Sequence, residues 1–152
     1  MKSLLYLLFI LIFFSSNGYS EIYKFTKIIE LNEPWGSSFI DNDEIIITEK
    51  SGKIKIVNIV SKEVTEIKHN LNFLEVGQGG LLDIIHQDNT LWISYSENRG
   101  DSKTSTSIAK ALLNKQELNF RNIFQATPPI NSGYHFGSRL AIKDNYLYAS
   151  VG

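Results

Sequence analysis

Two short glycine-rich segments carry the side chains that are best placed by type to bind and transform a small molecule. The first is Gly77-Gln78-Gly79-Gly80, and the second runs from Asn131 to Arg139 with His135 near its middle. Glycine lets the backbone approach a ligand closely. Histidine titrates near neutral pH and suits proton transfer. We therefore expect Gln78 and His135 to be the groups directed at a ligand.

Each of these residues also has a plainer interpretation. A glutamine among glycines is most often a loop residue that bonds to the backbone, and most histidines take no part in catalysis. His69 lies in a polar, turn-like run and is expected to be solvated, whereas His86 ends an apolar run and is expected to be structural. Neither has a metal-ligand partner at the spacing of a zinc site. The sequence has no Walker A, GxGxxG or GxSxG motif, so nucleotide binding and serine hydrolysis are unsupported.

The elements around these segments have the patterns of β-strands. Lys53–Val57 and Glu63–Lys68 alternate polar and apolar residues, which is typical of a strand with one buried face. Ile45–Thr48 is a β-branched run that suits a strand buried on both faces. Gly52 separates two of these runs as a hairpin turn would. The segment Ser107–Leu118 has a helix-forming composition, but its place inside a repeat where two more strands are due favours strand.

Three segments share one plan, an apolar pair followed by a polar turn and a β run closed by a hydroxyl residue. They are Phe39–Thr48, Ile84–Ser94 and Leu140–Ser150, with steps of 46 residues from Ile45 to Leu91 and 56 residues from Leu91 to Leu147. Four-stranded propeller blades recur at about 40 to 50 residues. The sequence therefore predicts an all-β fold with about two to three blades of a β-propeller. Both glycine-rich segments precede such a repeat, so we expect them at the same end of the propeller, near its axis.

The composition excludes several classes of protein. The 152 residues include no cysteine, which excludes a disulfide scaffold, a thiolate metal site and a cysteine nucleophile. A formal net charge of −1 argues against a nucleic-acid binder. The third repeat supplies about one hairpin, and two blades with part of a third cannot close a ring. We therefore expect residues 21–152 to be the N-terminal portion of a longer propeller.

Residues 1–20 have the pattern of a cleaved signal peptide. Lys2 is followed by the apolar run Leu4–Phe14, and Gly18 and Ser20 stand at the −3 and −1 positions of a cleavage site. The alternative is a transmembrane anchor, but spanning a bilayer needs about twenty apolar residues. Without a cysteine there is no lipoprotein anchor either. We expect a periplasmic or secreted bacterial protein with no stable membrane anchor.

Four short motifs follow one another in order along the chain. They are Pro34-Trp35-Gly36, Ile47–Lys50 with Gly52 and Ile54, Gly77–Asp83, and His135–Leu140. Together they resemble the soluble PQQ-dependent sugar dehydrogenases, the glucose/sorbosone dehydrogenase family, and most of all its aldose sugar dehydrogenase branch. The resemblance covers about residues 28 to 152.

This resemblance implies a six-bladed propeller that binds pyrroloquinoline quinone (PQQ) and calcium and oxidises aldose sugars to lactones, with an external electron acceptor. It implies that His135 is the general base, which takes the proton of the sugar's anomeric hydroxyl while hydride passes to the quinone. It implies that Gln78 hydrogen-bonds the cofactor. The cationic residues that grip the cofactor's carboxylates and all the calcium ligands are then expected beyond residue 152, so residues 1–152 alone are expected to be inactive.

Two other functions are consistent with the same fold. One is a non-catalytic secreted propeller used as a binding or interaction domain, since a fold does not by itself imply a function. The presence of both Gln78 and His135 favours the enzyme, because a binding module needs neither a base nor a quinone contact at these points. The other is a propeller lactonase, which would need carboxylate and asparagine metal ligands at the axis, where this sequence offers few.

Overall fold

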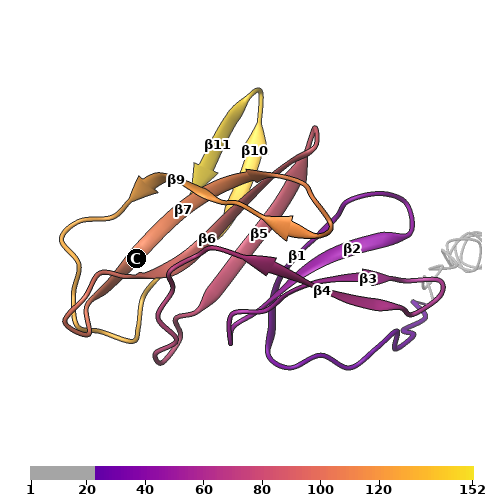
Figure 1. Cartoon of the computed structure of the whole chain (residues 1–152), viewed down its shortest axis with the longest axis horizontal. Helices are drawn as coiled ribbons and strands as arrows, with labels where there is room; N and C mark the ends of the chain where they lie inside the picture. The colour runs from indigo at the N-terminus through magenta and orange to yellow at the C-terminus, as the bar shows by residue number, and fades with distance from the viewer. Residues whose placement is uncertain (1–22) are drawn as a thin grey trace, which may run out of the picture.

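The computed structural model describes residues 23–152, and these residues form strands and loops with no helix. The predicted signal peptide, residues 1–20, lies outside the described residues. Within the described part, no helix is long and apolar enough to cross a membrane. The strands form two sheets and a final hairpin that follow one another in chain order (Figure 1). The all-β prediction is confirmed.

The first blade is an antiparallel meander. Its strands are β1 (Pro34–Phe39), β2 (Glu44–Glu49), β3 (Ile54–Asn58) and β4 (Val64–His69). β2 is the β-branched run expected from the sequence, and β3 and β4 are the two alternating runs. Gly52 has a φ of +99° in the turn between β2 and β3, as a hairpin glycine should.

The second blade consists of β5 (Leu81–Gln87), β6 (Thr90–Asn98), β7 (Thr104–Leu112) and β9 (Arg121–Gln125), again antiparallel. Half of the segment with helix-forming composition lies in strand β7 and none of it is helical, so the strand prediction is confirmed. The rest includes the short β8 (Glu117–Leu118), which pairs in parallel with β4 of the first blade. That pairing ties the two blades together at their outer edge.

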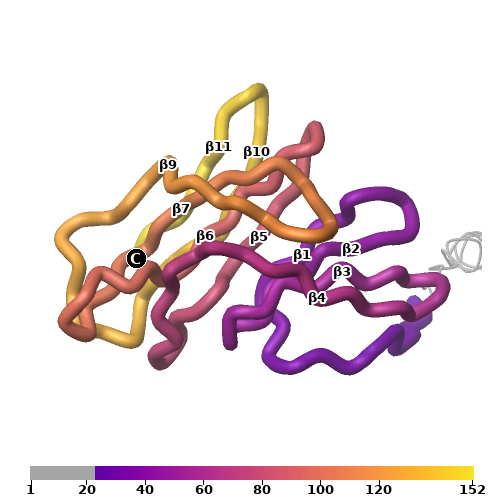
Figure 2. The backbone as a smooth tube through the Cα atoms, viewed as in Figure 1, coloured from indigo at the N-terminus to yellow at the C-terminus, as the bar shows by residue number. Residues whose placement is uncertain are grey.

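The third repeat is present as the hairpin of β10 (Leu140–Lys143) and β11 (Tyr146–Ala149). The chain path shows this hairpin beside β5 and β6 (Figure 2). Its turn, Asp144-Asn145, has φ values of 50° and 66°, and the β5–β6 turn, Asp88-Asn89, has 48° and 59°. Two consecutive positive φ values define the type I′ turn, whose twist matches that of the flanking strands. The polar turn is therefore a structural repeat in the second and third repeats, whereas Asp41-Asn42-Asp43 of the first repeat has no positive φ.

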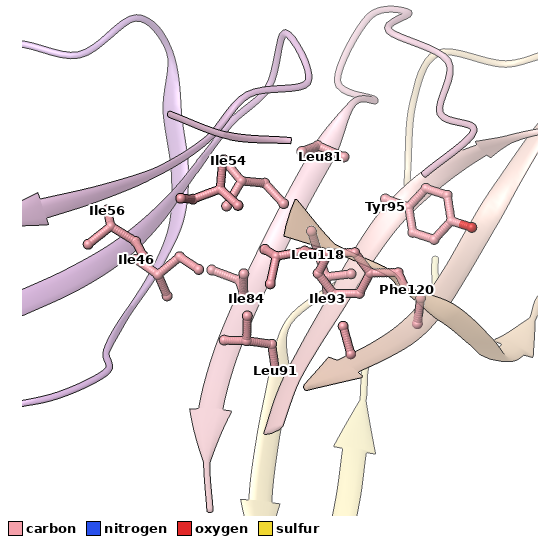
Figure 3. Packing of buried hydrophobic residues seen from close by; sticks show 13 residues of the cluster. Ile46, Ile54, Ile56, Leu81, Ile84, Leu91, Ile93, Tyr95, Leu118 and Phe120 are labelled. Carbon is pink, nitrogen blue, oxygen red and sulfur yellow. The ribbon is translucent and has the colours of Figure 1, made fainter. Parts of the chain in front are cut away.

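The core lies between the two blades. Apolar side chains of β2, β3 and β4 meet those of β5, β6 and β7, and Leu118 and Phe120 close the cluster (Figure 3). β1 packs directly on β5, and Gly36 makes this approach possible, because a Cβ there would lie 2.6 Å from the carbonyl oxygen of Leu82. Each blade is thus stabilised by its neighbour, as in repeat architectures.

Tyr95 in this core gives the protein a predicted loss of stability at alkaline pH. Its ring is buried and its hydroxyl donates to Asn122 Oδ1 at 2.7 Å. Burial, followed by the negative charge of Glu97, raises the pKa of Tyr95 to about 12. Unfolded tyrosine ionises near pH 10, so from about pH 10 to 12 the unfolded state releases a proton that the folded state keeps.

Stability should therefore fall as pH rises through this range and level off above it. Urea unfolding midpoints measured against pH test this, with Tyr95→Phe as the control. The phenylalanine variant should lose less stability across the window than the parent protein. If the unfolding midpoints of both proteins fell equally with pH, Tyr95 would not be the cause of the alkaline loss of stability.

Candidate functional site

The fold brings Gln78 and His135 into direct contact. Gln78 lies in the loop before β5 and His135 in the loop before β10, 57 residues later. The backbone N–H of His135 donates to Oε1 of Gln78 at 3.2 Å, and the N–H of Gln78 donates to the carbonyl of Gly133 at 2.7 Å. The expectation that the two glycine-rich segments lie at the same end of the fold is met by this geometry.

The glycines of the two loops are what allows this contact. Gly77 has a φ of +55°, and a Cβ built on it would lie 2.4 Å from the carbonyl oxygen of Gly133. Such a separation is far below van der Waals contact, so any larger residue at Gly77 would force the loops apart. The spacing of glycines around Gln78 thus has a packing cause that does not depend on a ligand.

His135 is held in an unusual backbone conformation. Its φ is +64°, in the left-handed region that residues other than glycine seldom adopt. Such conformations persist where the surroundings enforce them, and they are frequent at functional sites. The imidazole is exposed, and neither of its nitrogens bonds to another residue between 23 and 152. In the same part of the chain, the Nε2 amide of Gln78 has no partner either, so both groups are available to a ligand.

Buried hydroxyl groups of the second blade fasten the loop that carries His135. Thr106 Oγ1 donates to the carbonyl of Phe136 at 2.6 Å, and Ser94 Oγ donates to the carbonyl of Ser138 at 2.6 Å. Thr106 lies on β7 and Ser94 on β6, and both are buried. Because these bonds end on backbone carbonyls, they fix the path of the chain on the C-terminal side of His135.

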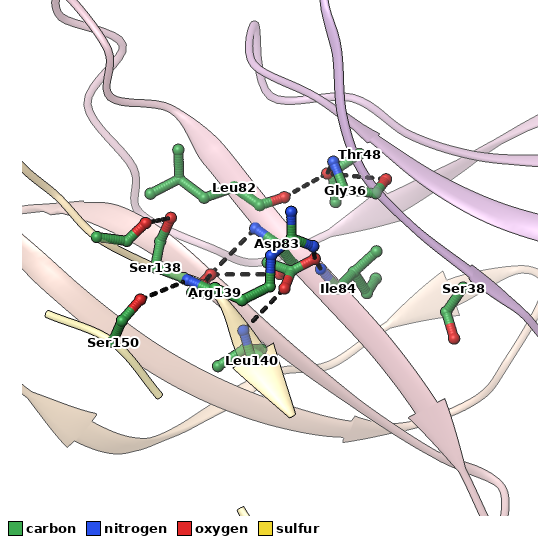
Figure 4. A network of polar contacts seen from close by, with 12 residues as sticks. Gly36, Ser38, Thr48, Leu82, Asp83, Ile84, Ser138, Arg139, Leu140 and Ser150 are labelled. Atoms are coloured by element: carbon green, nitrogen blue, oxygen red, sulfur yellow. Dashed lines mark hydrogen bonds and ion pairs between the residues drawn. The ribbon is translucent and has the colours of Figure 1, made fainter. Parts of the chain in front are cut away.

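The carboxylate of Asp83 completes the attachment (Figure 4). Asp83 is 3% exposed, and its Oδ2 accepts the N–H of Leu140 at 2.8 Å. Its Oδ1 accepts the N–H of Ile84 at 3.1 Å and pairs with the Arg139 guanidinium at 3.2 Å. Asp83 and Arg139 come from the two motifs that contain Gln78 and His135, so the motifs are joined at two points.

Sequence reasoning did not identify Asp83, Ser94 or Thr106 as residues that hold the site. In the sequence, Asp83 is only the last residue of the motif Gly77–Asp83. Ser94 is only the hydroxyl residue that closes the repeat Ile84–Ser94. Thr106 belongs to a run of four buried hydroxyl residues from 104 to 107. A fully buried polar run inside a strand needs bonding partners, and this requirement is the signal that could have singled it out.

The other two histidines lie outside the two glycine-rich loops. The expectation that His69 is solvated is wrong, because its side chain is half-buried and Nε2 contacts the carbonyl oxygen of Gly52 at 2.7 Å. Its Nδ1 accepts the N–H of Leu71 at 3.2 Å, so the ring braces the β2–β3 turn. His86 lies at the end of β5 and is half-buried, and its Nε2 has no hydrogen-bond partner among residues 23–152, so its structural role stays a prediction. Among residues 23–152, no group of three or more histidine, aspartate and glutamate side chains could hold a metal ion.

Comparisons with known proteins find the same family that the four sequence motifs resemble. The family model described as Glucose / Sorbosone dehydrogenase matches residues 31–152. Aldose sugar dehydrogenase YliI of Escherichia coli strain K12 is 29% identical over 133 residues, which cover 81% of this chain and 36% of that protein. The chain therefore spans little more than a third of the length of this curated relative.

Solved structures that are similar to this chain also include aldose sugar dehydrogenases. The apo-form of the soluble aldose sugar dehydrogenase of Escherichia coli is 30% identical, with a TM-score of 0.72 over 80% of this chain and 38% of that one. The PQQ-bound aldose sugar dehydrogenase of Streptomyces coelicolor is 23% identical, with a TM-score of 0.69 over 81% and 39%. The second likeness shows the fold alone. The described residues thus correspond to part of a β-propeller, as predicted.

Proposed function

The chain belongs to the glucose/sorbosone dehydrogenase family, and from this membership we propose that the protein of which it is part oxidises aldose sugars to lactones. One observation on this chain carries the proposal. The two loops that contain the family motifs meet at the bond between Gln78 Oε1 and the His135 N–H. A base and an amide donor, both free to face a ligand, are thereby placed side by side.

His135 is the proposed general base. A sugar hydroxyl is a poor hydride donor until its proton is being removed, so the reaction needs a base within hydrogen-bond reach that is poised near neutral pH. The imidazole of His135 is exposed and has no partner between residues 23 and 152, so it can accept the proton of the anomeric hydroxyl. The hydrogen bonds from Thr106 and Ser94 to the backbone after His135 hold the Cα of His135 in place. A fixed position of the base favours proton transfer from a bound sugar.

PQQ is the proposed cofactor, and it would supply the electron sink that accepts the hydride. Gln78 would contribute a hydrogen-bond donor to such a quinone, which carries oxygen acceptors. Because Oε1 of Gln78 is engaged by the His135 N–H, its Nε2 amide is the end left to donate to a quinone or carboxylate oxygen. Arg139 already pairs with Asp83. The family resemblance implies that the cations that grip the cofactor's carboxylates, and the calcium ligands, lie beyond residue 152.

The remaining parts of the proposal concern the setting of the reaction. An external electron acceptor would reoxidise the cofactor, and the protein would work in the periplasm or outside the cell after removal of residues 1–20. Residues 1–152 alone are expected to be inactive, since they lack most of the cofactor site. A non-catalytic propeller of the same family is the outcome that the following experiment would reveal if the enzyme proposal is wrong.

The test uses the protein encoded by the complete reading frame that contains this chain. The apoprotein is titrated with PQQ, followed by the quinone absorbance, and then assayed with aldoses and an artificial electron acceptor. We expect saturable binding and PQQ-dependent reduction of the acceptor. Absence of both would favour the non-catalytic alternative.

Gln78→Met sharpens this test, because methionine keeps the side-chain volume and removes both the free Nε2 donor and the Oε1 acceptor of the His135 N–H. Loss of the donor to the cofactor should weaken PQQ binding by about tenfold, and loss of the bond between the loops should add to this. Gln87→Met is the matched control, because Gln87 is exposed at the far end of β5 and should bind PQQ like the parent protein. Unchanged affinity in Gln78→Met would remove Gln78 from the proposed site.

A further inference from the structure

Lys50 lies at the end of the fold that holds Gln78 and His135. It directly follows β2, and its backbone N–H donates to the carbonyl of Glu33 at 3.1 Å. Its own carbonyl accepts the N–H of Leu81 at 3.3 Å. Because Glu33 directly precedes β1 and Leu81 begins β5, Lys50 joins the starting ends of two strands that pack on each other. The loop that contains Gln78 enters β5 at this same end.

The side chain of Lys50 runs along the bare backbone of Gly80, two residues from Gln78. A Cβ built on Gly80 would lie 2.9 Å from Cγ of Lys50 and 2.0 Å from its carbonyl oxygen. The lysine side chain is only 18% exposed, so most of its length is packed against the protein. The glycine directly before β5 thus leaves room for a lysine beside the loop of the candidate site.

The ammonium group of Lys50 is incompletely paired. Its ion-pair partner is Oε1 of Glu33 at 3.6 Å, which is too long for a hydrogen bond, and the Glu33 side chain is 53% exposed. Among residues 23–152, Nζ of Lys50 donates a hydrogen bond to no other group. An ammonium has three donors, and covering a charge is costly unless the charge is paired.

Lys55 shows how an equally covered lysine of the same blade is paired in full. Its side chain is 17% exposed, and its Nζ lies 2.7 Å from Oε1 of Glu49, which is fully buried. The same oxygen accepts the N–H of Asn32 at 2.8 Å, so Glu49 also holds the loop before β1. Lys55 is therefore satisfied within the protein, whereas Lys50 keeps unused donors at the end that carries the candidate site.

We propose that Lys50 is a further cofactor-binding residue, whose ammonium binds a carboxylate of the quinone that Gln78 faces. This inference rests on the proposed function. It adds a cation from the first blade to those that the family resemblance implies beyond residue 152. The carboxylates of PQQ make it an anion, and hydrogen bonds between an ammonium and a carboxylate are among the stronger ones in proteins.

The test is a titration of the apoprotein with PQQ, followed by the quinone absorbance, in the protein encoded by the complete reading frame. Lys50→Met keeps an unbranched stem along Gly80 and removes the charge, so it should weaken PQQ binding by about 10- to 100-fold. The difference from the parent protein should shrink as salt is raised, because salt screens the attraction. Lys53→Met is the matched control, since Lys53 carries the same charge but is 51% exposed and pairs with Glu66. It should bind PQQ like the parent.

Two further variants separate binding of the ligand from a structural role of the lysine. Lys50→Arg keeps a cation and should recover most of the affinity that Lys50→Met loses. Glu33→Gln removes the carboxylate that competes for the ammonium, and it should bind PQQ at least as tightly as the parent. If Glu33→Gln weakened binding as much as Lys50→Met, the ion pair would act through the fold and the proposal would be overturned.

Equal affinities of Lys50→Met and Lys53→Met would also overturn the proposal, while PQQ binding by the parent would leave the proposed function in place. Absence of PQQ binding by the parent would instead remove both. Urea unfolding of the apoproteins accompanies the titration. Weak binding by a Lys50→Met protein with the parent's unfolding midpoint would place the effect at the ligand. If that midpoint is lowered, Glu33→Gln decides, because it breaks the same ion pair without removing the cation.

Discussion

Replacing His135 with asparagine is expected to lower kcat for aldose oxidation by about 10²–10⁴-fold, the usual cost of losing a general base. Asparagine is chosen because it tolerates the left-handed backbone that His135 adopts, with its φ of +64°. It cannot accept the proton of the sugar hydroxyl at neutral pH. The variant therefore separates loss of the base from loss of the loop conformation, which His135→Ala alone would not.

The measurement compares kcat, KM and PQQ affinity of the parent protein with those of His135→Asn and His135→Ala. PQQ affinity should stay close to that of the parent in the asparagine variant. Full activity in His135→Asn would remove His135 as the base, even if the protein proves to be a dehydrogenase.

The strands and turns were predictable because their causes are local. Period-two alternation marks β3 and β4, and the polar pairs Asp88-Asn89 and Asp144-Asn145 sit where type I′ turns require two positive φ values. The second half of β7 is different, since the residues Ala109–Leu112 have no strand preference of their own. They are part of a strand because β7 pairs with β6 along nine residues and buries its side chains against the blade, and only the repeat pattern could indicate this.

The site was predictable in its residues but not in its contacts. The glycine-rich segments pointed to Gln78 and His135, yet their bond joins atoms 57 residues apart and runs from a side chain to a backbone N–H. No residue pattern encodes which backbone group a side chain will bond to. The same reason hid the role of Thr106, and it led to the wrong expectation for His69, whose partner is the carbonyl of Gly52. Polar side chains are visible in the sequence, whereas the main-chain groups they bond to are defined only by the fold.

Asp83→Ala is expected to lower the free energy of unfolding by about 3–5 kcal/mol, because it removes a buried carboxylate from several donors at once. The N–H groups of Leu140 and Ile84 would lose their acceptor, and the N–H of Leu140 is buried. Urea unfolding measures the total effect. Hydrogen exchange at the Leu140 amide should show lost protection, which would locate the damage at the junction of the second blade and the third hairpin.

Arg139→Ala is the matched control. It shows whether Asp83 stabilises the protein through its bonds to backbone N–H groups or through its ion pair with Arg139. The Arg139 side chain is 77% exposed, so its ion pair with Asp83 should contribute less than about 1 kcal/mol. If the backbone bonds dominate, Arg139→Ala stays close to the parent protein while Asp83→Ala does not. Equal and small effects would contradict this account. The loop that carries His135 would then owe its position to Thr106, Ser94 and Gln78 alone, and Asp83 would be a buried charge with no structural consequence.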